Sequence, residues 1–93
     1  MVFSWIKDKI PHCSYVKKRM NGNIMIICAS SLTIYYLNQS AAFFINSADG
    51  TKTVSDIKDE FLQHYEVDAC ELERDIVDII RDLQWKRILT LEE

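Results

Sequence analysis

The chain has 93 residues, which is enough for one domain and too few for two independent hydrophobic cores. Hydrophobic residues make up 48% of it and charged residues 27%, with two Gly and one Pro, so we expect a folded chain rather than a disordered one. The net charge is −3, and residues 47–93 carry thirteen of the fourteen acidic residues, which argues against a nucleic-acid-binding protein. Because so small a core leaves little room for a deep cavity, binding at a surface groove is favoured.

The first residues read as a short amphipathic helical turn. Phe3, Ile6 and Ile10 recur at helical spacing, and Pro11 is expected to end that turn. We therefore predict an N-terminal helical segment over residues 1–11, followed by one domain over residues 12–93.

Three antiparallel strands are predicted next. Residues 14–20 and 24–28 are rich in strand-forming side chains and flank Asn21-Gly22, the strongest short hairpin signal. After a weaker turn at residues 29–31, residues 32–37 form a third strand of branched and aromatic side chains.

Three helices are predicted to follow the strands. Asn38 is placed to cap a short helix that ends before Asp49-Gly50. Thr53 and the acid three residues later resemble a capping box, which predicts a helix over residues 54–65. Asp68 caps the longest helix, which ends between residues 84 and 87 and precedes a short apolar tail. The predicted fold class is α+β, a three-stranded antiparallel sheet followed by three helices.

The cysteines and the apolar runs limit location and chemistry. Cys13, Cys28 and Cys70 are far apart and form no C-x-x-C pair, which disfavours a metal site. Residues 1–10 lack the apolar core of a secretion signal, and the longest clean apolar run, residues 24–29, is far short of the roughly 20 residues of a membrane span. We therefore expect a cytoplasmic protein without a membrane segment and with reduced thiols.

Catalysis is not expected. The candidate nucleophiles and bases are the three cysteines together with His12 and His64, and none lies in a recognisable motif. A small core position is the stronger interpretation of Cys28. We predict a protein that is not an enzyme and needs no cofactor or metal.

The third strand and the last helix carry more apolar surface than a one-sided core needs. Leu32, Ile34 and Tyr36 alternate with Thr33, Tyr35 and Leu37, so both faces of the strand are apolar. If this strand lies at a sheet edge, an extended peptide can pair with it.

On the last helix, Val77 lies about 130° from the centre of the apolar stripe at about 100° per residue, and Ile80 lies between the two. Together with Glu73 and Gln84 these residues widen the apolar face and are candidates to line a groove. Coverage by a neighbouring element is an equally open alternative.

A series of short motifs resembles the PqqD-like family. The resemblance covers roughly residues 12–91 and consists of a Leu-Asn strand end, a small-residue helix, a "DG-x-x-T-V-x-x-I" helix start and an "F-L-x-x-Y-x-V-D" junction. The residues that carry it are Tyr36-Leu37-Asn38, Ala41, Asp49-Gly50, Thr51, Thr53-Val54, Ile57, Phe61-Leu62, Tyr65, Val67-Asp68, Asp75, Leu83 and Ile88. The order and spacing of these motifs are more specific than any one of them.

This resemblance implies a winged-helix-like domain that recognises precursor peptides in the biosynthesis of ribosomally made, modified peptides. In the family, the leader of the precursor adds as a strand beside the third strand, in the cleft between that strand and the third helix. It is then presented to a separate modifying enzyme. Radical S-adenosylmethionine enzymes, leader peptidases and cyclases are usual partners, and nothing in the sequence selects among them. By this analogy the peptide-binding residues are Leu32, Thr33, Ile34, Tyr35, Tyr36, Glu73, Val77, Ile80 and Gln84, where the four helix positions are a geometric choice.

Two alternatives from other functional classes stay open. A winged-helix fold also permits DNA binding, although the acidity of the chain disfavours it. The same apolar edge is also compatible with a homodimer in which the strands of two copies pair.

Overall fold

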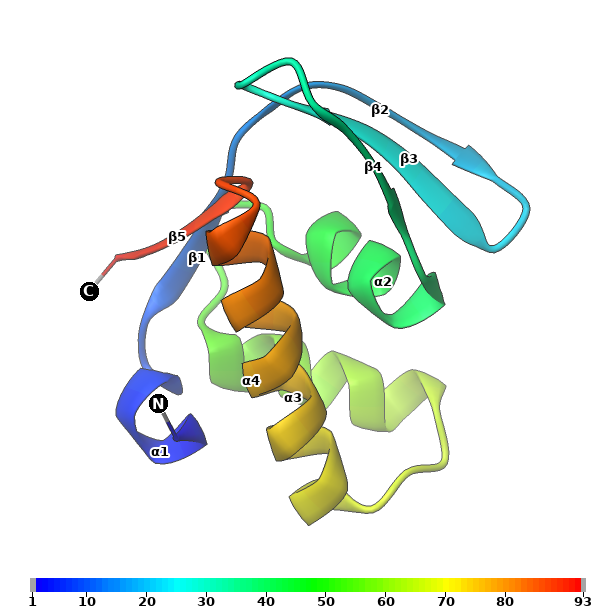
Figure 1. Cartoon of the computed structure of the whole chain (residues 1–93). Helices are drawn as coiled ribbons and strands as arrows, with labels where there is room; N and C mark the ends of the chain where they lie inside the picture. Colours follow the sequence, from blue (N-terminus) through cyan, green and yellow to red (C-terminus); the bar gives the residue numbers. More distant parts are fainter. Residues whose placement is uncertain (1, 93) are drawn as a thin grey trace.

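A computed structural model describes residues 2–92 (Figure 1). The elements in chain order are α1 (Phe3–Ile6), β1 (Ile10–Cys13), β2 (Tyr15–Asn21), β3 (Ile24–Ala29), β4 (Ile34–Leu37), α2 (Gln39–Ser47), α3 (Val54–His64), α4 (Ala69–Trp85) and β5 (Leu89–Glu92). The predicted α+β class, a three-stranded antiparallel sheet followed by three helices, is confirmed. The N-terminal helix is shorter than predicted, because it ends at Ile6 and Ile10 begins β1.

The three-stranded sheet has the order β2-β3-β4, and both of its pairings are antiparallel. The β2–β3 turn passes through Gly22 at φ +65°, a conformation that glycine adopts without steric cost. The hairpin predicted at Asn21-Gly22 is therefore confirmed.

A second sheet was missed by the sequence analysis. β1 pairs with β5 in antiparallel register, with Pro11 opposite Leu91 and Cys13 opposite Leu89. A segment near the start of the chain is thus paired with one near its end, and the boundary expected at Pro11 falls inside a strand (Figure 1). Proline is tolerated there because each strand of a two-stranded sheet is an edge strand.

The three later helices begin at the predicted caps. Asn38 Oδ1 accepts a hydrogen bond of 2.9 Å from the Ala41 amide. Thr53 Oγ1 accepts from the Asp56 amide at 3.1 Å while the Asp56 carboxylate accepts from the Thr53 amide at 3.0 Å, so the capping box is complete. Asp68 caps α4 with its side chain alone, because its Oδ2 accepts from the Glu71 amide at 3.1 Å. These side chains satisfy amide groups that would otherwise have no partner in the first turn.

The helices pack against one face of the three-stranded sheet. α2 lies between β3 and α3, and α4 crosses both helices (Figure 1). The most completely buried large side chains come from every layer: Phe44, Met25, Ile27, Ile57, Ile76, Ile80, Leu83 and Ile88. Among the described residues, no helix combines the length and the apolar character needed to cross a membrane.

Candidate peptide-binding cleft

The outer edge of β4 is unpaired within residues 2–92. β4 pairs with β3 on one side, and no described strand pairs with it on the other. Its side chains alternate: Ile34 and Tyr36 are 58% and 71% exposed, whereas Tyr35 is half-buried and Leu37 is buried. The alternation predicted for these four residues is therefore present, and the strand lies at the edge where an added strand could pair.

The hydrogen-bond pattern shows which backbone groups face that open edge. The Ala29 amide donates to the Thr33 carbonyl at 3.0 Å. In an antiparallel ladder the bonded pairs alternate, so Tyr35 and Leu37 bond to β3 while the N–H and C=O groups of Ile34 and Tyr36 point away from it. The edge therefore offers two donors and two acceptors to an incoming strand.

A cleft of about 340 Å³ lies beside this edge. One wall is the end of β4 and the start of α2, and the other wall is α4; the lining residues are Tyr36, Leu37, Asn38, Ala41, Asp78, Ile79, Asp82 and Lys86. A smaller hollow of about 100 Å³ follows between α4, α2 and α3 and shares Ile79 with the first. Ile79 is thus the apolar floor common to both.

Carboxylates dominate the helix wall of these hollows. Asp78 and Asp82 line the larger hollow, and Asp75 lines the smaller one. Lys86 Nζ lies 2.5 Å from Asp82 Oδ2 and 5.3 Å from the centre of the Tyr35 ring. This lysine therefore connects the end of α4 to β4 and leaves the acidic groups of the preceding turns facing the cleft.

The predicted helix residues lie on the other side of α4. Glu73 pairs with Lys58 of α3 at 2.5 Å, and Lys58 Nζ lies 5.2 Å from the centre of the Phe3 ring of α1. Val77 is only 8% exposed and lines a hollow with Phe3, and Ile80 is fully buried.

Glu73, Val77, Ile80 and Gln84, which were predicted to form a groove with the third strand, therefore do not line the cleft beside β4. At about 100° per residue this set is centred roughly 90° to one side of the core stripe, whereas the cleft residues of α4 are centred roughly 90° to the other side. For Val77 the alternative of coverage by a neighbouring element is correct, and the element is α1.

Two of the predicted strand residues also lie outside β4. Leu32 has φ +66° and is 73% exposed in the turn between β3 and β4, where its amide donates to the Ala29 carbonyl. Thr33 precedes the first residue of the strand. A left-handed residue cannot continue a strand, so the third strand is two residues shorter than predicted.

Sequence reasoning missed Asp78, Ile79, Asp82 and Lys86 as cleft residues. The predicted groove rested on the apolar stripe of α4 and on Val77 beside it. The available signal for the four cleft residues was their i, i+1, i+4, i+8 spacing, which puts them on one flank of that stripe. Which flank faces β4 depends on tertiary packing.

The candidate catalytic groups are dispersed. His12 Nε2 lies 3.2 Å from Glu92 Oε2 at the β1–β5 sheet, and the His64 ring packs edge-on against Phe43. Burial raises the pKa of the Cys13 thiol to about 11, so this thiol stays protonated at neutral pH. Within residues 2–92, no three His, Cys, Asp or Glu side chains gather in a way that could hold a metal ion.

A small α+β domain with an open strand edge beside a helix-lined cleft is the class of protein that this geometry defines. The family model described as coenzyme PQQ synthesis protein D (PqqD) matches residues 26–89, which is more than half of the chain. The chain therefore belongs to the PqqD family.

The fold is also similar to that of TbiB1, solved in complex with the TbiA(β) leader peptide. That match has a TM-score of 0.71 and 20% sequence identity, and it covers 82% of this chain and 93% of the TbiB1 chain. Among curated proteins, none matches this sequence significantly.

Proposed function

We propose that this protein binds the leader of a ribosomally made precursor peptide by strand addition at β4 and presents it to a separate modifying enzyme. The observation that carries the proposal is the free edge of β4, where the amides and carbonyls of Ile34 and Tyr36 point outward beside the cleft. Membership of the PqqD family and the leader peptide bound by TbiB1 support it.

The cleft constrains the chemistry of the leader. The partly buried Ile79 suits an aliphatic or aromatic side chain of the leader, and Asp75 and Asp78 beside it suit a lysine or arginine. The proposed leader therefore places an apolar anchor and a basic residue on the strand face that points at α4. Its role is binding, and the reaction belongs to the partner enzyme, for which a radical S-adenosylmethionine enzyme is one candidate.

The first experiment is affinity capture of the tagged protein from native lysate of cells shown to express a precursor peptide. Mass spectrometry is set to detect short peptides as well as enzymes. The proposal predicts recovery of a short peptide together with a modifying enzyme. Recovery of nucleic acid, or of the protein alone, would instead favour the DNA-binding or dimer alternative.

Hydrogen exchange then tests the mode of binding. In the free protein the Ile34 and Tyr36 amides should exchange quickly, while the Tyr35 and Leu37 amides, bonded to β3, should exchange slowly. Addition of the recovered peptide should slow exchange at Ile34 and Tyr36 by at least about tenfold, because each amide gains a strand partner. Binding that leaves both amides unprotected would refute strand addition at β4.

A further inference from the structure

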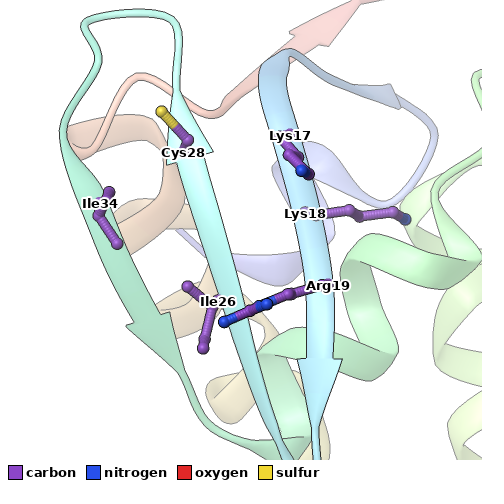
Figure 2. A pocket seen from close by; sticks show the side chains of 6 residues that line it. All are labelled: Lys17, Lys18, Arg19, Ile26, Cys28 and Ile34. Carbon is purple, nitrogen blue, oxygen red and sulfur yellow. The ribbon is translucent and has the colours of Figure 1, made fainter.

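The three-stranded sheet has a second, outward face that is not part of the core and that shares only Tyr36 with the lining of the cleft. The registers place Lys17, Cys28 and Ile34 in one cross-strand row and Arg19, Ile26 and Tyr36 in the next. These side chains point away from the helices, and Figure 2 shows Lys17, Arg19, Ile26, Cys28 and Ile34 on that side of the strands. We call these two rows the outer sheet face.

The outer sheet face is both apolar and hollow. Ile34 and Tyr36 are more than half exposed, and Ile24, at the end of β3 on the same face, is 48% exposed. A hollow of about 230 Å³ lies over Ile26, Cys28 and Ile34, between β4 and the basic side chains of β2. Apolar side chains gathered on an exposed sheet face are typical of an interaction surface.

Two cations border this apolar surface on the β2 side. Lys18 is turned to the opposite face, where its Nζ donates to Asn46 Oδ1 at 2.9 Å (Figure 2). Lys17 and Arg19 stay on the outer face, and within residues 2–92 the side chain of neither one makes an ion pair or a hydrogen bond. In a chain of net charge −3, this face therefore has a local positive charge that the molecule itself does not neutralise.

We propose that the outer sheet face docks a protein surface in which aliphatic or aromatic side chains are flanked by Asp and Glu. The apolar groups would cover Ile26 and Ile34, and the carboxylates would meet Lys17 and Arg19. Charge complementarity selects this partner over a second copy, because two copies meeting face to face would bring four unpaired cations into one interface.

The position of β4 identifies the partner as the modifying enzyme, a step that rests on the proposed function. Alternate side chains of a strand added beside β4 point to the same side as Ile34 and Tyr36. The outer sheet face and the outward side chains of the leader would then form one continuous surface. An enzyme that docks there would contact this protein and the bound leader at the same time. This shared surface is a physical basis for presentation of the leader.

Synthetic peptides test the docking surface without knowledge of the enzyme or the leader. The probes are nine-residue peptides that alternate Leu with Glu, Leu with Lys, or Ser with Glu, titrated into the ¹⁵N-labelled protein. The Leu–Glu peptide should shift the amide signals of β2, β3 and β4 around Arg19, Ile26 and Ile34 saturably, and should bind at least about tenfold more tightly than the other two.

Arg19→Glu should weaken that binding by at least about tenfold, whereas Lys7→Glu, an equal charge change on an exposed residue after α1, should change it less than about twofold. Circular dichroism establishes that both variants are folded.

Equal binding of the Leu–Lys peptide, shifts centred on Asp78 and Ile79, or equal effects of the two substitutions would overturn the proposal. Shifts on the outer face that grow with protein concentration in the absence of peptide would assign the face to a second copy. Protection of the Ile34 and Tyr36 amides by the leader is measured separately, so a failure here is distinct from failure of leader binding.

Discussion

Proline substitutions in β4 separate peptide binding from folding. Tyr36→Pro removes an amide that points to the open edge, whereas Tyr35→Pro removes an amide that donates to β3. We expect Tyr36→Pro to fold and to lose leader binding, and Tyr35→Pro to be strongly destabilised. Proline is found in natural sheets at edge positions of the first kind.

The magnitudes follow from the hydrogen bond that each amide makes. One strand hydrogen bond contributes about 0.5–1.5 kcal/mol, which is about 2- to 13-fold in the dissociation constant, and the proline ring also obstructs the approaching carbonyl. Tyr36→Pro should therefore bind the leader at least about tenfold more weakly than Tyr36→Ala, which removes the same side chain and keeps the amide. Tyr35→Pro should lower the free energy of unfolding by about 3 kcal/mol or more.

The assays are fluorescence anisotropy with the labelled leader recovered by capture and urea denaturation followed by circular dichroism. Tyr36→Pro and Tyr36→Ala should differ in unfolding free energy by less than about 1 kcal/mol, because neither changes the β3–β4 ladder. If Tyr36→Pro binds the leader as tightly as Tyr36→Ala, the leader does not pair with this edge. If Tyr35→Pro and Tyr36→Pro are equally destabilised, the assignment of inward and outward amides is wrong.

Three further predictions concern α4, a helix cap and a thiol. Ile80→Ala should lower the unfolding free energy by about 2–5 kcal/mol because Ile80 is fully buried, whereas Ile79→Ala should chiefly weaken leader binding. Thr53→Ala should cost about 0.5–2 kcal/mol by removing the acceptor of the Asp56 amide. The pKa of the Cys13 thiol rises from the ordinary 9.0 to about 11 in the fold. The free energy of unfolding of the wild type, relative to Cys13→Ala, should therefore fall by about 1 kcal/mol between pH 9 and 11. This figure is reduced to allow for the partial exposure of the thiol.

Urea denaturation measures all three effects, with anisotropy added for Ile79→Ala. Equal destabilisation by the two isoleucine substitutions would contradict the assignment of Ile79 to the cleft. A Thr53→Ala variant as stable as the wild type would mean that the capping box does not hold α3. The sign of the Cys13 effect follows from the unfolded thiol, which ionises first as the pH rises. A wild type that gained stability over Cys13→Ala in this range would contradict it.

Local sequence signals were sufficient to predict much of the fold. Asn38, Thr53 and Asp68 each form a hydrogen bond within three residues of themselves, so their effect on chain direction is readable without tertiary information. The Asn21-Gly22 turn is similarly local. The pairing of β1 with β5 is not, because it joins Ile10 to Glu92 across nearly the whole chain through two four-residue strands. Neither strand is long enough to show a pattern of its own.

The strand half of the candidate site was largely predictable, and the helix half was not. Alternation identified the outward residues Ile34 and Tyr36, because a strand has only two faces. A helix stripe has two flanks, and its periodicity does not tell which one meets the sheet. The groove was predicted on the flank with Val77, which carries the additional apolar side chain, whereas the cleft lies along the flank with Asp78 and Asp82.

The short N-terminal helix explains why the more apolar flank is the covered one. Ile6 is part of the core, Phe3 packs beside Val77, and the Lys58 ammonium bridges the Phe3 ring and the Glu73 carboxylate. α1 therefore covers part of the side of α4 that would otherwise expose Val77, whereas the flank along β4 lines the cleft. Val77 of α4 packs against α1, and Asp78 and Asp82 on the other flank line the cleft that we propose binds the leader. The additional apolar residue Val77 beside the stripe thus indicated a packing partner within the chain rather than the binding groove.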